Sequence, residues 1–97
     1  MAKPLTSAQI RAARALLRWT AEELARRSLL SVATIRRAEL TDGETSLTAA
    51  NDLAVRRVLE DAGVEFIDED GGGPGLRLRK RSTSGDPTSR SPDRVKR

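Results

Sequence analysis

The 97-residue sequence contains no cysteine, no histidine and no tyrosine, and it has one tryptophan and one phenylalanine. The absence of cysteine excludes a disulfide framework and thiolate chemistry. Histidine, cysteine and tyrosine supply many of the general bases and nucleophiles of enzymes. Because all three are missing, we expect no enzymatic activity and no catalytic residue, and we find no pattern for a cofactor or a metal.

Long apolar runs are also missing, because no stretch reaches the roughly 18 consecutive apolar residues that a transmembrane helix needs. The first nine residues, MAKPLTSAQ, lack the apolar segment of a secretory signal. We therefore expect a cytoplasmic protein with no membrane partner.

Positive charge is in excess, with 18 lysines and arginines against 14 acidic residues and a net charge of +4. Residues 75–97 hold eight basic residues against two acidic ones, whereas residues 64–74 hold four acidic residues and no basic one. A basic balance favours nucleic acid or another polyanion as a partner. A tail that only raises solubility is the alternative.

Apolar residues at helical spacing predict four helices, over residues 7–18, 21–28, 32–39 and 49–61. Each follows a serine or threonine that suits the N-cap position, and a glutamine or glutamate three residues after the first two caps indicates capping boxes. The caps are Thr6, Thr20, Ser31 and Thr48, and the expected core residues are Ile10, Ala13, Leu16, Leu17, Trp19, Leu24, Ala25, Ile35, Leu53, Ala54, Val58 and either Leu59 or Ala62.

After Gly63 the apolar residues follow a period of two, which predicts strands over residues 64–68 and 76–80. The glycine-rich join between them favours a hairpin or strands paired across a dimer seam. Residues 81–97 have one aliphatic residue, two prolines and scattered charge, so we expect a disordered basic tail.

Residues 20–39, TAEELARRSLLSVATIRRAE, have the pattern of a helix-turn-helix. The first helix directs Leu24 and Ala25 inward, residues 28–30 form the turn, and Ser31 caps a second helix with Ile35 on its inner side. The residues left to face outward are Val32, Ala33, Thr34, Arg36 and Arg37.

Residues 6–63 resemble the lambda-repressor-like helix-turn-helix domain of the xenobiotic-response-element (XRE) family of bacterial and phage regulators. The resemblance implies a mainly α fold of four to five helices over 1–63, with a short strand or hairpin extension over 64–80 and the tail over 81–97. The extension is similar to one on a small proteobacterial branch of that family. The matching positions are Trp19, Thr20, Glu23, Leu24, Ala25, Ser31, Ile35 and Glu39.

The resemblance implies a transcription regulator that binds double-stranded operator DNA, with its second motif helix in the major groove. Arginine binds guanine bidentately, and small apolar side chains suit thymine methyl groups. The start of the first motif helix would receive a DNA phosphate. The family also implies an ion pair between Arg14 and Glu39. The expected DNA-binding residues are Thr20, Ala21, Ser31, Val32, Ala33, Thr34, Arg36 and Arg37.

Two alternatives remain open for the extension. A lone two-stranded hairpin is marginal in water, so its apolar residues either join two copies in a homodimer or cover the chain's own core. The extension or tail also suits a protein-interaction module, an antitoxin or antiactivator that binds its own promoter as well. No residues indicate a small-molecule ligand. The candidate dimerisation residues are Val64, Phe66, Leu76 and Leu78.

Overall fold

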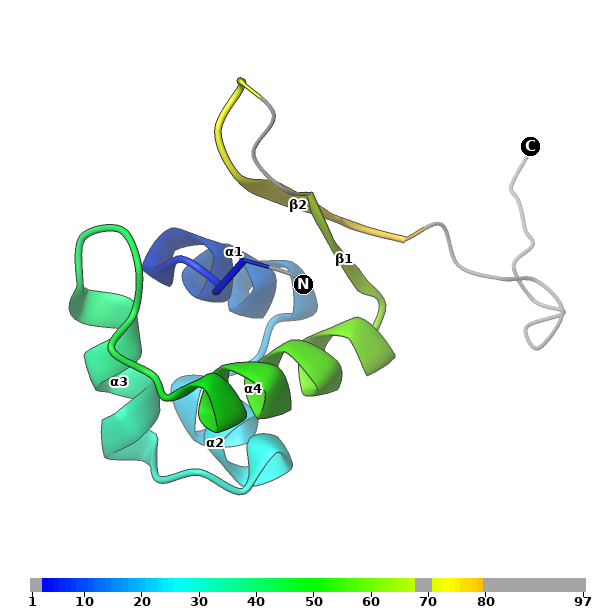
Figure 1. Ribbon diagram of the computed structural model, residues 1–97. Helices are drawn as coiled ribbons and strands as arrows, with labels where there is room; N and C mark the ends of the chain where they lie inside the picture. Colours follow the sequence, from blue (N-terminus) through cyan, green and yellow to red (C-terminus); the bar gives the residue numbers. More distant parts are fainter. Residues whose placement is uncertain (1–2, 68–70, 80–97) are drawn as a thin grey trace, which may run out of the picture.

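The part of the chain that the structure describes is mainly helical, with four helices followed by a short antiparallel hairpin. The computed structural model describes residues 3–67 and 71–79, and the expected disordered tail over 81–97 lies outside them. The helices group around one centre, and the hairpin follows directly from α4 and lies across α1 (Figure 1). The elements are α1 (Ser7–Leu17), α2 (Ala21–Ser28), α3 (Val32–Leu40), α4 (Ala49–Asp61), β1 (Val64–Ile67) and β2 (Gly75–Leu78).

The helices begin where the sequence places their caps. In each case the cap hydroxyl accepts the backbone N–H three residues later, which satisfies one of the donors that a helix start leaves without a partner. Gln9 completes a capping box by accepting the N–H of Thr6 at 3.0 Å. The second predicted capping box is incomplete, because Glu23 turns its carboxylate to two arginines instead. The caps are Thr6, Thr20, Ser31 and Thr48.

The core lies where the inner faces of the helices meet β1. Two of the predicted core positions are wrong: Leu16 and Leu53 are 44% and 45% exposed. In α4 the inward line is Val55 and Leu59, one turn apart, and Leu53 lies about 200° around the helix from Val55. The buried apolar residues are Leu5, Ile10, Ala13, Ala21, Leu24, Ala25, Ile35, Ala38, Val55, Leu59 and Val64.

The hairpin covers the chain's own core. Val64 pairs with Leu78, and Phe66 pairs with Leu76, so the four candidate dimerisation residues share one face. Val64 is fully buried, Phe66 and Leu76 pack against the core, and Leu78 is 45% exposed. A homodimer that uses this face would therefore have Leu78 as its most accessible apolar residue.

The loop after α3 is tied to the start of α1. The backbone N–H of Ser7 donates to the carbonyl of Gly43 at 2.8 Å, where the positive φ of 94° suits glycine. The buried Ser7 hydroxyl donates to the carbonyl of Ala38 and contacts the hydroxyl of Thr41. These bonds fix the C-terminal end of α3 against α1. Within the described residues, no helix is long and apolar enough to span a bilayer.

Candidate nucleic-acid interface

A tight turn joins α2 to α3. Ser28, which the sequence places in the turn, is the last residue of α2 and is buried, with its hydroxyl donating to the carbonyl of Leu24 at 2.7 Å. Leu29 ends the helix in the left-handed conformation, with φ of 61°, and its side chain is 89% exposed. The N–H of Leu30 donates to the carbonyl of Ala25 at 2.9 Å and closes the turn.

The outward face of α3 carries the small and basic side chains expected from the sequence. Ile35 is fully buried, while Arg36 and Arg37 are exposed on the opposite side. Val32 departs from the prediction because it packs against the core instead of facing outward. Ala33 is therefore the exposed small apolar residue in the first turn of α3.

Two further predicted contacts, Ser31 and Thr34, lie at the start of α3 and bond to each other. The Ser31 hydroxyl accepts the N–H of Thr34 at 3.1 Å, and the two hydroxyl oxygens lie 2.8 Å apart. Ser31 is exposed and Thr34 is half-buried. Both hydroxyls therefore remain near the surface beside Ala33, at the end of the helix that would read bases.

The ion pair expected between Arg14 and Glu39 is present and anchors α3 to α1. Arg14 donates to both carboxylate oxygens, at 2.6 and 2.8 Å, and to the carbonyl of Trp19 at 2.9 Å. Glu39 is buried, and the hydrogen bond that Arg14 donates to its carboxylate raises the pKa of Arg14 above its usual value. The bidentate geometry fixes the position of α3 relative to α1.

The start of α2 does not present an open anion site. Thr20 is exposed, but its hydroxyl already accepts the N–H of Glu23 at 3.0 Å, and Ala21 is buried. The Glu22 carboxylate lies over the same turn, where hydrogen bonding to its own backbone N–H and the charge of Arg36 lower its pKa. The predicted phosphate position at Thr20 and Ala21 is thus shared with a carboxylate of the chain itself.

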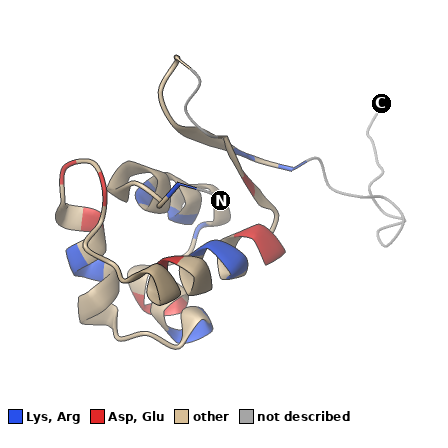
Figure 2. Cartoon of the chain, in the orientation of Figure 1, with Lys and Arg blue, Asp and Glu red and all other residues tan. Residues whose placement is uncertain are grey.

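Most arginines of α2 and α3 are already paired with glutamates. Arg26 and Arg27 both bond to Glu23, whose pKa is lowered chiefly by the hydrogen bond from Arg27. Arg36 bonds to Glu22 across the two helices. Within the described part of the chain, Arg37 forms no ion pair. Both α2 and α3 consequently carry basic and acidic residues (Figure 2).

The roles that four residues of this region have in the structure were not predicted from the sequence. Glu22 and Glu23 matter because they pair with the arginines, and the spacing of Glu23 before Arg27 is a signal visible in the sequence. The pairing of Glu22 with Arg36 spans 14 residues and gives no such signal. Leu29 and Leu40 are 89% and 82% exposed at the two ends of α3, which hydrophobicity alone does not predict.

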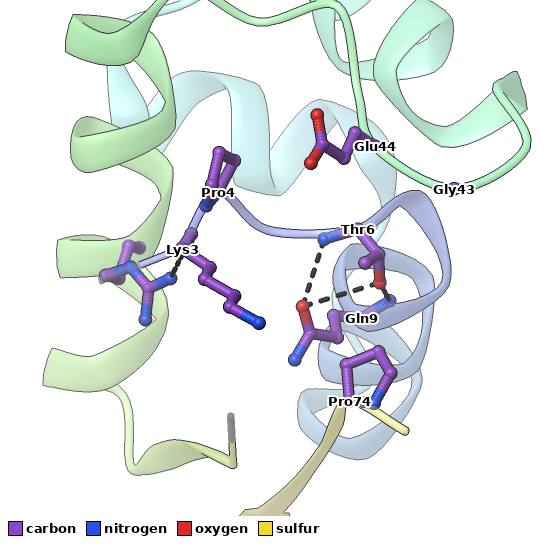
Figure 3. A pocket seen from close by; sticks show the side chains of 8 residues that line it. Lys3, Pro4, Thr6, Gln9, Gly43, Glu44 and Pro74 are labelled. Atoms are coloured by element: carbon purple, nitrogen blue, oxygen red, sulfur yellow. Dashed lines mark hydrogen bonds between the residues drawn. The ribbon is translucent and has the colours of Figure 1, made fainter. Parts of the chain in front are cut away.

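A separate cavity of about 360 Å³ lies between the N-terminal segment, α1, α4 and the hairpin (Figure 3). Lys3 and Glu44 reach its rim and are exposed. Its buried polar side chain is Gln9, which accepts from the N–H of Thr6 and donates to the carbonyl of Gly75 at 3.0 Å. Gln9 thus joins β2 to α1 through both ends of its amide group, which accounts for its burial without a ligand.

Comparison of the sequence with protein-family models and with curated proteins finds no match. The function is therefore inferred from the geometry of α2, the turn and α3.

Proposed function

We propose that the chain is a sequence-specific DNA-binding transcription regulator of the lambda-repressor-like XRE class. The observation that carries this proposal is the outward face of α3, which presents Ala33, Arg36 and Arg37 in one exposed stripe. A helix held this way can enter the major groove, with arginine forks on guanine and the alanine methyl on thymine. As such a regulator, the protein acts on double-stranded DNA in the cytoplasm.

The rigid mounting of α3 supports the proposal. A base-reading helix must keep its register relative to the helices that contact the DNA backbone. Here the Arg14–Glu39 pair and the Ser7 hydroxyl hold the C-terminal half of α3, and the Ser31 cap defines its start. The exposed arginines are thus presented from a fixed scaffold.

Fluorescence-anisotropy titration of genomic DNA fragments, including the chain's own promoter, tests the proposal. We expect tight binding to one fragment and its loss in the Arg36→Ala/Arg37→Ala double variant. The matched control is Arg57→Ala, which removes an exposed arginine on α4. Weak, salt-sensitive binding to every fragment, unchanged in the double variant, would contradict the proposal and assign binding to nonspecific charge.

We also propose that the chain binds operator DNA as a homodimer, because palindromic half-sites are read by two-fold related copies. In the hairpin, the outer strand edges and the partly exposed Leu78 are the candidates for the contact between the two copies. Val64 is buried in the chain's own core. Sedimentation at micromolar concentration tests it. A monomeric mass both alone and on a palindromic duplex would contradict it.

A second function, a protein-interaction module such as an antitoxin or antiactivator, is favoured by one specific observation. Leu29 and Leu40 are the two most exposed large apolar side chains of the described residues; Leu29 ends α2 just before α3, and Leu40 is the last residue of α3. Large apolar side chains that a partner protein covers are frequent anchors of protein contacts. Loss of regulation in Leu29→Ser/Leu40→Ser, with DNA affinity unchanged, would favour this second function.

A further inference from the structure

Arg36 and Arg37 are neighbours in the sequence but differ in their ion pairing. Arg36 donates to the carboxylate of Glu22 in the first turn of α2, 14 positions earlier in the chain. Arg37 has no ion-pair partner among the described residues. In the free chain, therefore, one of the two arginines of the outward face is engaged and the other is available.

The engaged pair lies at the surface. The side chains of Arg36 and Glu22 are 57% and 61% exposed, so water and salt reach both of them. An exposed pair of this kind is weak and opens readily. It can therefore be exchanged for a stronger acceptor without any rearrangement of the helices.

Glu22 also lies at the end of α2 where the sequence predicts a phosphate contact. It stands in the first turn of α2, next in sequence to the predicted phosphate contacts Thr20 and Ala21, and its exposed carboxylate accepts the hydrogen bond from Arg36. A phosphate approaching this turn meets a like charge, and Arg36 cannot reach the DNA until it leaves Glu22. Both effects oppose binding, and both originate from one carboxylate.

We propose that Glu22 limits DNA affinity by holding Arg36 against α2 in the free chain, and that DNA binding exchanges this carboxylate for an acceptor on the DNA. The inference rests on the proposed function, and it identifies Glu22 as a residue that sets affinity and specificity without reading a base. A DNA site with a guanine that Arg36 can bind bidentately compensates for the lost ion pair. At a DNA site without such a guanine, Arg36 stays bound to Glu22. The contact thereby favours discrimination between sites.

Glu23 provides the matched comparison. It stands next to Glu22 in the same turn and carries the same charge, but it bonds to Arg26 and Arg27 instead of Arg36. Substituting either glutamate by glutamine changes the net charge equally. A difference between the two variants that depends on Arg36 therefore reports the contact and not the charge.

The test is a double-substitution cycle read by fluorescence anisotropy at low salt. The probes are a duplex selected by the wild-type chain from a random-sequence pool and a scrambled duplex. We expect Glu22→Gln to raise affinity for the selected duplex by about five-fold, the upper range for an exposed pair. In the Arg36→Ala background we expect Glu22→Gln to raise the affinity by a smaller factor. Glu23→Gln should change the affinity by the same factor in wild type and in Arg36→Ala. Equal gains for Glu22→Gln in both backgrounds, or a loss of affinity, would overturn the inference.

A second measurement on the free chain separates failure of this inference from failure of the proposed function. The Glu22 side-chain carboxyl is titrated by NMR in wild type and in Arg36→Ala. We expect its midpoint to rise when Arg36 is removed, because the cation that favours the carboxylate is lost. An unchanged midpoint would overturn the ion pair itself, whether or not the chain binds DNA. If the titration midpoint rises but the wild-type chain binds no DNA, the regulator function is rejected. The proposal that Glu22 limits DNA affinity is then rejected with it.

Discussion

Arg14 binds both carboxylate oxygens of Glu39, at 2.6 and 2.8 Å, and so joins the last turn of α1 to the end of α3. Because Glu39 is buried, its carboxylate depends on this partner for the hydrogen bonds that water would otherwise supply. The pair therefore acts as a positioning contact for the helix that carries Arg36 and Arg37.

We predict that Arg14→Ala lowers the free energy of unfolding by about 3–5 kcal/mol, because it leaves the Glu39 carboxylate buried without its partner. Urea denaturation followed by circular dichroism measures this. Arg77→Ala is the control, since it breaks the exposed pair with Glu65 and should cost far less stability than Arg14→Ala. Equal losses for the two variants would show that the Arg14 pair is no more than a surface contact.

We predict that substitution by glycine has opposite effects on stability at Leu29 and at Leu40. Leu29 has a positive φ and an exposed side chain, so Leu29→Gly should stabilise the fold by about 0.5–1 kcal/mol. Leu40 is equally open to solvent but is helical, so Leu40→Gly should destabilise by a similar amount, about 0.5–1 kcal/mol. Thermal unfolding of both variants decides this, and destabilisation by Leu29→Gly would refute the backbone argument.

Ser7→Ala should destabilise the protein by about 1–2 kcal/mol, because it removes a buried donor to the carbonyl of Ala38. Thr41 donates to the same carbonyl at 3.2 Å and limits the loss. The same substitution at the exposed Ser46 is the control and should be near neutral. Unfolding in urea gives the free energy of unfolding of both variants. If both match wild type, the Ser7 hydrogen bond does not stabilise the fold.

Acid should destabilise the fold through its glutamates. The pKa of Glu65 is lowered by hydrogen bonding to Arg77, and the pKa values of Glu22 and Glu23 are also below the ordinary 4.5. A carboxylate with a lowered folded pKa contributes stability above its unfolded pKa and loses it as pH falls through the folded value. The free energy of unfolding should therefore hold down to about pH 4.5 and decline below it.

Urea denaturation at a series of pH values checks this decline. Glu65→Gln removes one of the titrating groups, so its loss of stability below pH 4.5 should be shallower than that of wild type. A stability that rises on acidification would contradict the assignment.

Val64→Ala and Leu78→Ala distinguish core packing from self-association in the hairpin. Val64 is fully buried, so its truncation should cost about 2–3 kcal/mol through lost burial and a residual cavity. Leu78 is 45% exposed and should cost less than about 1 kcal/mol in the monomer. Urea denaturation gives the stabilities and sedimentation gives the mass. Leu78→Ala with wild-type stability but a lower mass would place Leu78 in the dimer contact.

The bounds of the helices and strands follow from the sequence to within about two residues. Thr6, Thr20, Ser31 and Thr48 each lie immediately before a helix, because capping involves residues only three positions apart. The inward face of α4 was less predictable, since Leu53 and Val55 are both apolar and only packing against α2 and β1 selects between them.

The sequence by itself determined where the elements begin and end and which side chains can lie on the outer side of α3, because caps and periodicity are local. The tertiary structure decided which of those side chains are available. It packed the partly buried Val32 against the core, buried Val64, paired Arg36 with Glu22, and left Arg37 without an ion-pair partner in the described chain. Burial and ion pairing depend on residues that packing brings together from distant positions, and no local pattern encodes them.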